Sequence, residues 1–453
     1  MNLPNYFLAD LPPEAAFTPQ MITEACATLK HNRERYLVTR STPGILELIA
    51  EVAENWLNEA YPFRKLAVEQ GPKETGFSRG TLTTGLDNFF IQLTAENLSA
   101  LIAQDLGHAK RLDDLVATGA EERSNRAAFA VGPEFLVHIA AGNIPNPAMM
   151  SIVLGLLTRS AQFVKCASDR SFLPRLFAHS LYDADHKLGA CLEIAEWRGG
   201  TALLEDALFA GADCVTATGS DETLAAIRLM LPARTRFLGY GHRVSFGFVA
   251  SGVLSGFGAR KIAQRASADV VAWDQLGCLS PHVIYVEHGG RVTAEQFAEM
   301  LAEELTQREQ SEPRGALRVE EAATISSRRA FYEVRAAHSP DTRMWCSEGS
   351  TAWTVVYEAD AKFQTSCLNR FVYVKGTAGL NEVLQSADSV RGQVSTVGLA
   401  AEEDAGWDLT RKLIRWGVGR ICPLGQMQNP PLTWRHDGRP ALGDLVAWTD
   451  WEG

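Results

Sequence analysis

The fold class is indicated by residues 135–147, which read Phe-Leu-Val-His-Ile-Ala-Ala-Gly-Asn-Ile-Pro-Asn-Pro. The first six residues form a short apolar run that is typical of a buried strand. Pro145 and Pro147 then favour the start of a helix over residues 146–158, because the first helical turn has backbone N–H groups without partners and tolerates proline. A buried strand followed at once by a helix is typical of an α/β unit with a parallel sheet.

The same alternation continues along the chain after this stretch. Four more short runs of β-forming residues are separated by helical patterns, which predicts a doubly wound parallel sheet. Such a sheet binds ligands at the carboxyl ends of its strands. The predicted strands are residues 135–140, 161–166, 191–197, 212–218 and 235–238.

The regions on either side differ in pattern. Before residue 130 the pattern is helical: Thr18-Pro19 and Thr42-Pro43 are typical helix starts, and an apolar stripe follows through Ile45, Leu46, Ile49, Val52 and Trp56. After residue 245, strands at 283–287 and 371–374 and a capping box of Thr293 and Gln296 predict a second α/β unit. The apolar, glycine-rich run 246–259 fits either the border of a tunnel for an alkyl chain or a buried helix.

These patterns divide the chain into four expected parts. Residues 1–130 form a helical region that packs on the next domain, and residues 131–245 form a Rossmann-like domain, of a kind that commonly binds dinucleotides. Residues 246–420 form the second α/β unit, where we expect catalysis. Residues 421–453, called the tail below, are rich in Pro, Gly and Trp and look irregular; we expect them to return to the core or to an oligomer interface.

Composition excludes several classes of protein. The 453 residues include 46% hydrophobic and 21% charged side chains, as in an ordinary globular protein. The net charge of -11, without a basic block, argues against binding nucleic acid. The eight cysteines form no CxxC pair and the histidines show no ligand spacing, so we predict neither a metal site nor a disulfide framework. The N-terminus resembles no signal peptide and no apolar run is long enough to span a membrane, so we expect a cytoplasmic protein.

The standard nucleotide fingerprints are absent. Residues 239–244, Gly-Tyr-Gly-His-Arg-Val, begin like GxGxxG but lack the third glycine. No P-loop, HExxH or GxSxG sequence occurs. A nucleotide bound by this sheet must therefore be held by another set of residues.

Four ordered segments supply such a set: Ala-Gly-Asn-Ile-Pro at 141–145, Val-Lys-Cys-Ala-Ser at 164–168, Ala-Thr-Gly-Ser at 217–220 and Trp-Asp-Gln-Leu-Gly-Cys-Leu-Ser-Pro at 273–281. Their order resembles the aldehyde dehydrogenase superfamily. With the His-Asp-Gly at 436–438, they more closely resemble the LuxC-type long-chain acyl-CoA reductases, the fatty acid reductases of bacterial luminescence. The resemblance covers roughly residues 130–450 and implies an aldehyde dehydrogenase-like α/β fold.

The resemblance implies a covalent mechanism. Cys278 matches the family's nucleophile, since a thiolate exchanges with an acyl thioester and the enzyme-bound thioester then accepts hydride. Asn143 matches the oxyanion donor, which would stabilise the charge on the thioester oxygen together with the backbone N–H of Cys278. From the residues alone, Cys278 fits a buried structural cysteine as well, and Asn143 fits a turn residue.

The same resemblance implies cofactor contacts. Lys165 matches a lysine that reaches the adenosine ribose; Gly219 and Ser220 match the turn beside the pyrophosphate, where helix N–H groups favour phosphate. Gly239 and Gly241 belong to a Gly-x-Gly pattern also found in acylating relatives. NAD-preferring relatives carry a carboxylate where this chain has Ser168, and Arg170 follows, so we expect NADPH, with NADH as the alternative.

One departure from the hydrolytic aldehyde dehydrogenases bears on the product. Those enzymes carry a glutamate that activates water, whereas residues 239–243 of this chain contain no carboxylate. We therefore expect reduction of an acyl thioester to an aldehyde. His242, in the replaced segment, is the candidate to transfer a proton, or else fixes the loop, and His436 is either structural or part of a pocket.

Two other functions stay open: an aldehyde dehydrogenase that forms acid, and a non-redox protein for acyl transfer or scaffolding. The leading interpretation predicts acyl-CoA or an acylated partner protein as substrate. The resemblance adds an acyl-protein synthetase as a potential partner and a homo-oligomer as the expected assembly. No recognisable motif indicates the length of the acyl chain or the identity of the acyl donor.

Overall fold

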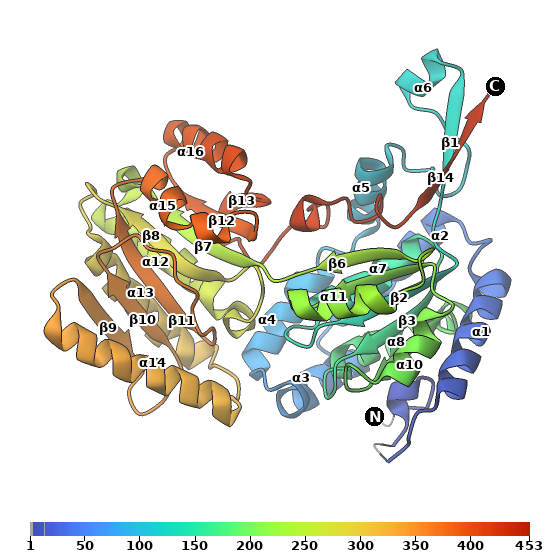
Figure 1. Ribbon diagram of the computed structural model, residues 1–453, viewed down its shortest axis with the longest axis horizontal. Coiled ribbons are helices and arrows are strands. Elements are labelled where there is room, and N and C mark those ends of the chain that lie inside the picture. The colour runs from blue at the N-terminus through green and yellow to red at the C-terminus, as the bar shows by residue number, and fades with distance from the viewer. Residues whose placement is uncertain (1–2, 13) are drawn as a thin grey trace.

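The computed structural model describes residues 3–12 and 14–453. A five-stranded parallel sheet with the order β4-β3-β2-β5-β6 forms the core of one half of the molecule (Figure 1). The predicted alternation and the α/β fold class are confirmed, and two of the predicted strands match to the residue. The strands are β2 (Phe135–Ala140), β3 (Ala161–Cys166), β4 (Leu192–Glu196), β5 (Cys214–Thr218) and β6 (Arg236–Tyr240).

Helices cover both faces of this sheet because successive strand residues point to opposite sides. Val164 and Cys166 of β3 belong to a core with α7 and α8, whereas Phe135 and Phe163 pack with α1 and α10. The helices that follow the strands are α7 (Asn146–Leu157), α8 (Phe172–Ala184), α9 (His186–Gly189), α10 (Ala202–Phe209) and α11 (Asp221–Met230).

The N-terminal region is helical, as predicted. Thr18 caps α1 through its side chain, and Pro19 is the first helical residue. In α2 the cap is Ser41 and not Thr42, which is already helical, and the predicted apolar stripe is fully buried. The helices are α1 (Pro19–Tyr36), α2 (Thr42–Leu57), α3 (Pro62–Thr75), α4 (Arg79–Phe90), α5 (Ala95–Leu106) and α6 (Gly119–Arg123).

A seven-stranded sheet forms the other half, with the order β13-β12-β7-β8-β11-β10-β9, and only the edge strand β9 runs antiparallel to its neighbour. The run 246–259 is not a single helix: it begins inside the buried strand β7 and ends in the first turn of α12 (Gly256–Val271). The strands are β7 (Val244–Val249), β8 (Pro281–Glu287), β9 (Thr342–Cys346), β10 (Thr354–Glu358), β11 (Phe371–Thr377), β12 (Val394–Ala400) and β13 (Arg420–Pro423).

Helices also cover both faces of this second sheet. Ile284 and Val286 of β8 pack with α12 and α13, whereas Val283 and Tyr285 pack with α14, α15 and α16. The predicted capping box of Thr293 and Gln296 opens α13. The helices are α12 (Gly256–Val271), α13 (Ala294–Ser311), α14 (Val319–His338), α15 (Leu380–Ser386) and α16 (Glu403–Trp416).

The tail crosses from the second half back to the first (Figure 1). It contains the 3-10 turn η5 (His436–Gly438) and ends in β14 (Ala447–Glu452), which pairs antiparallel with β1 (Arg126–Val131). This β1–β14 ribbon protrudes from the molecule, and every residue of β14 is exposed (Figure 1). Across residues 3–12 and 14–453, no helix combines the length and apolarity needed to cross a bilayer.

Candidate active site

Cys278 lies in the loop 276–280, called the Cys278 loop below, between the 3-10 turn η3 (Ala272–Gln275) and β8. Ser245 Oγ of the neighbouring strand β7 donates a hydrogen bond to the Cys278 carbonyl at 2.8 Å. Gln275 Nε2 donates to the Pro281 carbonyl at 2.8 Å and so closes the loop at its base. These bonds hold the loop to the sheet from both ends.

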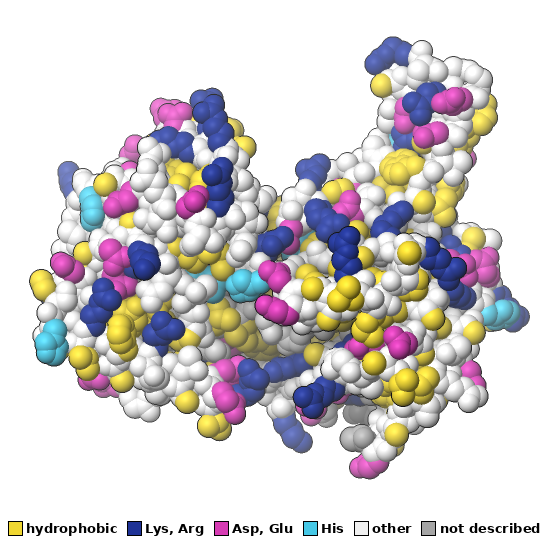
Figure 2. Space-filling view, viewed as in Figure 1, with side chains coloured by type: hydrophobic (Ala, Val, Ile, Leu, Met, Phe, Trp, Pro, Cys, Tyr) yellow, Lys and Arg dark blue, Asp and Glu magenta, His cyan; other side chains and the backbone are white. Residues whose placement is uncertain are grey.

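The loop borders a cavity of about 390 Å³ between the two halves of the molecule. Figure 2 shows hydrophobic and histidine side chains where the two halves meet. Four parts of the chain supply much of the lining, namely α4, α7, α12 with η3, and the tail; apolar lining residues include Phe89, Met150, Leu154, Trp273 and Leu432. Among the described residues, Cys278 is the one cysteine that lines this cavity. A thiol beside an apolar cavity can receive an alkyl chain attached to a reactive carbonyl.

Packing fixes one wall of the cavity. A Cβ atom on Gly85 of α4 would lie 2.2 Å from the indole ring of Trp273, so only glycine allows this approach. Asp269 of α12, also at the cavity, accepts hydrogen bonds from the backbone N–H groups of Gly425 at 2.5 Å and Met427 at 2.9 Å. Burial raises the pKa of Asp269 to about 7. The tail is thus attached to α12 beside Cys278.

The thiol of Cys278 is protonated at neutral pH in this state. Burial, with a smaller effect of the Asp437 carboxylate, raises its pKa to about 12, and Arg243 acts in the opposite direction. Burial raises the pKa of Cys26 and Cys166 to about 12 as well. Acidity therefore does not distinguish Cys278; its place at the cavity does, and its reaction requires a proton acceptor.

His436 is such an acceptor on the wall of the same cavity. Its imidazole stacks on Tyr240, with 4.7 Å between ring centroids, and packs against Trp434. Burial lowers the pKa of His436, so the ring is neutral near pH 7 and can accept a proton. The next residue, Asp437, forms an ion pair with Arg243 at 3.1 Å.

His242 and Asn143 lie outside this cavity. The His242 side chain is exposed, and its backbone N–H donates to Asp221 Oδ1 at 3.2 Å. Asn143 is exposed at a separate hollow of about 30 Å³ that Cys166 and Arg170 also line. Its neighbour Ile144 reaches the Cys278 cavity, so the Asn143 backbone lies one residue from it.

The predicted cofactor residues lie at the carboxyl edge of the five-stranded sheet. Lys165 is buried at the end of β3, with Nζ 5.7 Å from the Trp197 ring centroid. Burial lowers its pKa, opposed by Glu205 and Glu196, and within the described chain its ammonium group forms no hydrogen bond or ion pair. An ammonium group without a protein acceptor, at the tip of a mostly buried side chain, fits the hydroxyl groups of a ribose. Ser168 is exposed nearby, and both Glu196 oxygens accept backbone N–H groups, from Asp169 and Ser171.

The second cofactor segment starts α11. Ser220 caps the helix and accepts a hydrogen bond from Thr223 N at 3.3 Å, which leaves other first-turn N–H groups at the sheet edge. Gly239 and Gly241 pack against the same helix; a Cβ on Gly241 would lie 2.3 Å from Asp221 Oδ1. The structure therefore places the glycines beside the predicted pyrophosphate turn.

The chain matches the family described as acyl-CoA reductase (LuxC) over residues 37–448. It belongs to the LuxC family. The long-chain acyl-protein thioester reductase of Aliivibrio fischeri is 24% identical to it over 417 residues, which cover 90% of this chain and 82% of that protein. The reductase of the same name from Vibrio harveyi is 22% identical over 430 residues, covering 92% and 84%. This LuxC chain is thus an oxidoreductase of acyl groups.

Solved structures extend the fold comparison. This LuxC chain is similar to the aldehyde dehydrogenase PutA of Anabaena variabilis, with a TM-score of 0.71, 15% identity and coverage of 96% of this chain and 93% of that one. A bifunctional proline utilization A protein gives a TM-score of 0.72 at 17% identity, and the match spans 45% of that chain. The fold is therefore that of the aldehyde dehydrogenases, as expected.

Sequence reasoning missed Asn146 and Asp269, which both line the cavity beside Cys278. Asn146 lines it, and among the described residues its Oδ1 is buried without a hydrogen-bond partner. Asp269 lines the cavity from α12, whereas Asp437 of the tail lies near Cys278 without lining the cavity. Asp437 also qualifies the argument from the missing glutamate, because a carboxylate does lie near Cys278, although it is paired with Arg243. Asn146, the second asparagine of the 135–147 stretch, was a visible signal, and Asp437 belongs to the His-Asp-Gly sequence noted at 436–438, whereas no motif marks Asp269.

Proposed function

We propose that this protein reduces a long-chain acyl thioester to an aldehyde with NADPH, through an acyl group bound to Cys278. The observation that carries this proposal is the position of Cys278 on an apolar cavity of about 390 Å³. An alkyl chain in that cavity places its thioester carbonyl at the thiol. Fatty acyl-CoA or an acylated partner protein serves as donor, in line with the name of the Aliivibrio fischeri relative.

The proposed reaction begins with transfer of the acyl group to Cys278 and ends with its release as aldehyde. The Cys278 sulfur attacks the thioester carbonyl, the carbon–sulfur bond to the donor breaks, and the donor thiol leaves with a proton. A reduced nicotinamide, when bound, supplies hydride to the acyl carbonyl. Hydride addition leaves an oxyanion on the carbon bound to Cys278; as the aldehyde carbonyl re-forms, the carbon–sulfur bond breaks, and the Cys278 thiolate takes up one proton from solvent to give the free thiol.

His436 is our candidate to accept the Cys278 proton and to return it to the donor thiol. It is neutral and lines the same cavity, whereas the predicted candidate His242 is exposed outside it. A general base must come within reach of the proton it takes, which favours His436. The backbone N–H of His242 fixes its loop against α11, in a contact that does not use the imidazole.

Asn143 is our candidate for the oxyanion donor, together with the Cys278 N–H. It precedes Ile144, whose side chain approaches Gly277: a Cβ on Gly277 would lie 3.6 Å from Ile144 Cδ1. The Asn143 backbone therefore runs beside the Cys278 loop, and catalytic contacts commonly tighten only with substrate present. Asn146 is the competing donor from the same segment.

Lys165 and Ser168 support NADPH as the cofactor. The free ammonium group of Lys165 would bind the ribose, and Ser168 offers a hydroxyl where a carboxylate would repel a 2′-phosphate. Asp169 beside it is exposed, so NADH stays the alternative cofactor. Ser220 and the first turn of α11 would hold the pyrophosphate.

Assembly and partners follow from the same proposal. A homo-oligomer would use the β1–β14 ribbon, where Trp448 and Trp451 are 45% and 51% exposed. An acyl-protein synthetase would act as the partner that supplies the acyl group. All eight cysteines are unpaired, which is compatible with the expected cytoplasmic location.

Mass spectrometry of the intact protein tests the function. Incubation with a series of acyl-CoAs should add the acyl mass to the wild type and not to Cys278→Ala, and NADPH should then remove it as aldehyde. Free acid formed from an aldehyde without CoA would instead favour the acid-forming dehydrogenase. Absence of any thermal stabilisation by NADPH or NADH would favour the non-redox function.

A further inference from the structure

The residues before Cys278 have an unusual backbone. Trp273, Asp274 and Gln275 lie in the left-handed region, with φ of 50°, 51° and 64°. L residues with side chains rarely adopt this conformation, and three in succession are rarer still. Such strain persists only where surrounding contacts fix it, and it concentrates at functional sites.

A second turn of the same kind lies before β11. Leu368, Asn369 and Arg370 have φ of 61°, 56° and 63°. The two turns together account for six of the ten positive-φ residues other than glycine in the described chain. They lie almost a hundred residues apart in sequence, so no local pattern links them.

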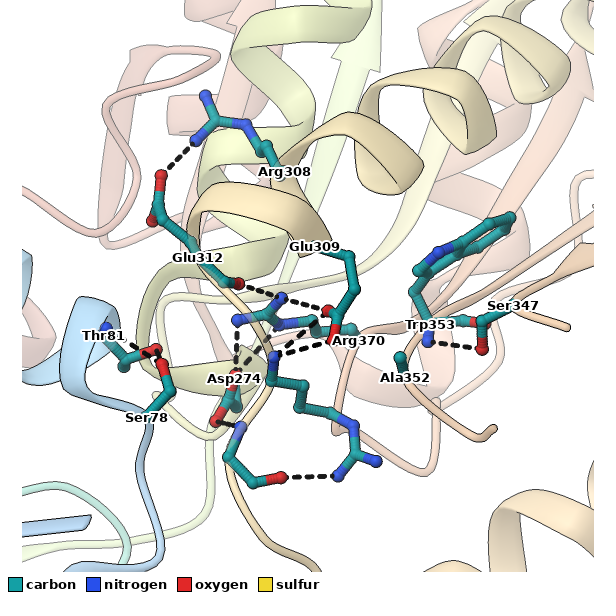
Figure 3. A network of polar contacts seen from close by, with 12 residues as sticks. Ser78, Thr81, Asp274, Arg308, Glu309, Glu312, Ser347, Ala352, Trp353 and Arg370 are labelled. Carbon is teal, nitrogen blue, oxygen red and sulfur yellow. Dashed lines mark hydrogen bonds and ion pairs between the residues drawn. The ribbon is translucent and has the colours of Figure 1, made fainter. Parts of the chain in front are cut away.

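A buried ion pair joins the two turns. Arg370 donates to Asp274 Oδ1 from Nε at 2.9 Å and pairs with it from Nη2 at 2.8 Å, and their side chains are 1% and 4% exposed. Gln275 Nε2 also donates to the Phe371 carbonyl at 3.0 Å. Figure 3 shows Arg370 lying between Asp274 and Glu309. Each turn is therefore held by the other.

Further contacts fix the pair in place. Arg370 Nη1 contacts Glu309 Oε2 at 3.0 Å and donates to the Glu312 carbonyl at 2.7 Å, both at the end of α13 (Figure 3). Asp274 Oδ2 accepts the Gly315 N–H at 3.1 Å. The pair is thus attached to α13 and to the chain that leaves it.

Stability does not account for this arrangement. A buried ion pair contributes little net stability compared with apolar packing, and left-handed residues are unfavourable. What the arrangement does provide is position: Cys278 follows Gln275 by three residues, and Trp273 forms a wall of the cavity. We therefore attribute to the ion pair a role in positioning Cys278 and Trp273 and not in stabilising the fold.

We propose that the Asp274–Arg370 pair is a positioning device that holds the strained turn 273–275, and with it the Cys278 thiol and the Trp273 ring, in the orientation needed for attack on an acyl thioester. The inference deepens the proposed function, since it takes Cys278 as the nucleophile. Neither Asp274 nor Arg370 lines the cavity, so both act through the turn.

The test compares two reactions of the Cys278 thiol. Releasing the turn should slow acylation by acyl-CoA about 100-fold in Asp274→Asn and Arg370→Gln, because small misplacements of reacting atoms have large effects. The same variants should react about tenfold faster with iodoacetamide, since the thiol is no longer held in its buried position. Peptide mass spectrometry at Cys278 measures both rates, and stabilisation by NADPH should be unchanged.

A second buried ion pair, between β10 and β11 of the seven-stranded sheet, serves as the control. Lys375 and Glu358, 1% and 3% exposed, pair at 2.9 Å away from the cavity, so Glu358→Gln should lower the melting temperature and change neither rate. Glu309→Gln and Arg370→Lys keep part of the network and should give smaller changes in the same directions, which keeps the test available if the other variants fail to fold.

Each outcome has a fixed meaning. Opposite changes of the two rates support the positioning role. Rates within twofold of the wild type, or a parallel fall of both that Glu358→Gln reproduces, overturn it. A wild type that acyl-CoA never acylates would count against the proposed function alone, because iodoacetamide and hydrogen exchange of residues 272–281 still report whether the pair holds the turn.

Discussion

The cofactor edge and the Cys278 loop are built in opposite ways. At the cofactor edge, Lys165 keeps its ammonium group without a partner in the described chain, and Ser168 is exposed. Around Cys278, polar groups are used by the protein itself: Ser245 binds the Cys278 carbonyl and Gln275 closes the loop. The first region keeps groups available for a ligand, and the second fixes a reactive atom. Changes in the first should therefore affect binding, and changes in the second should affect rate and stability.

Cys278→Ser should give the largest effect and the sharpest separation of the two regions. Acylation and aldehyde formation should fall by about 10⁴-fold or more, because an alcohol is a far weaker nucleophile than a thiolate at neutral pH. Thermal stabilisation by NADPH should persist. Loss of both properties would mean that the two regions are not separable.

Asp269→Asn tests how far the stability of the Cys278 region depends on protonation of the buried Asp269 carboxyl group. The folded-state pKa of about 7 lies above the ordinary 3.8, so the folded chain holds a proton that the unfolded chain has already released above pH 4. Stability from this group is therefore present below pH 4 and is lost as pH rises towards 7, by up to about 4 kcal/mol. Denaturant unfolding at pH 5 and pH 8 should show about 3 kcal/mol of this loss in the wild type and none of it in Asp269→Asn.

The matched control is Asp408→Asn, because that side chain is 75% exposed and forms only a surface ion pair. It should retain the wild-type dependence on pH. If Asp269→Asn also retained it, the buried carboxyl would not be the group that releases the proton.

The strands were predictable and the loop was not, for physical reasons. Residues 135–140 and 161–166 form apolar runs whose periodicity needs no distant contact, and β2 and β3 match them to the residue. Trp273 and Gln275 have side chains that disfavour positive φ, so the conformation of the turn follows from the contact of Asp274 with Arg370, 96 residues beyond it. Cys278 and Lys165 were found through a motif resemblance, and their geometry came only with the fold.

Alanine substitutions of Asn143 and Asn146 test which of the two side chains is the oxyanion donor beside the Cys278 loop. Asn143→Ala should lower the rate of aldehyde formation about 10²-fold to 10³-fold, which is typical for loss of one oxyanion donor. Asn146→Ala should lower it less than tenfold, because a wall residue affects mainly binding of the chain. Single-turnover rates with preloaded acyl-enzyme measure both variants, and the reverse ranking would assign the donor to Asn146.

The smallest expected effect is that of a substitution at the cofactor edge, at Ser168. It tests whether this region affects cofactor binding alone. Ser168→Asp places a carboxylate beside the predicted ribose site, where it would accept hydrogen bonds from a 2′-hydroxyl and repel a 2′-phosphate. The dissociation constant for NADPH should rise about tenfold and that for NADH should fall, whereas Cys278 acylation without cofactor stays at the wild-type rate. Ser168→Asn, which adds similar bulk without charge, should change the preference for NADPH by less than threefold. An equal loss of both cofactors in Ser168→Asp would remove Ser168 from the ribose site, and slower acylation would show that the cofactor edge also shapes the Cys278 loop.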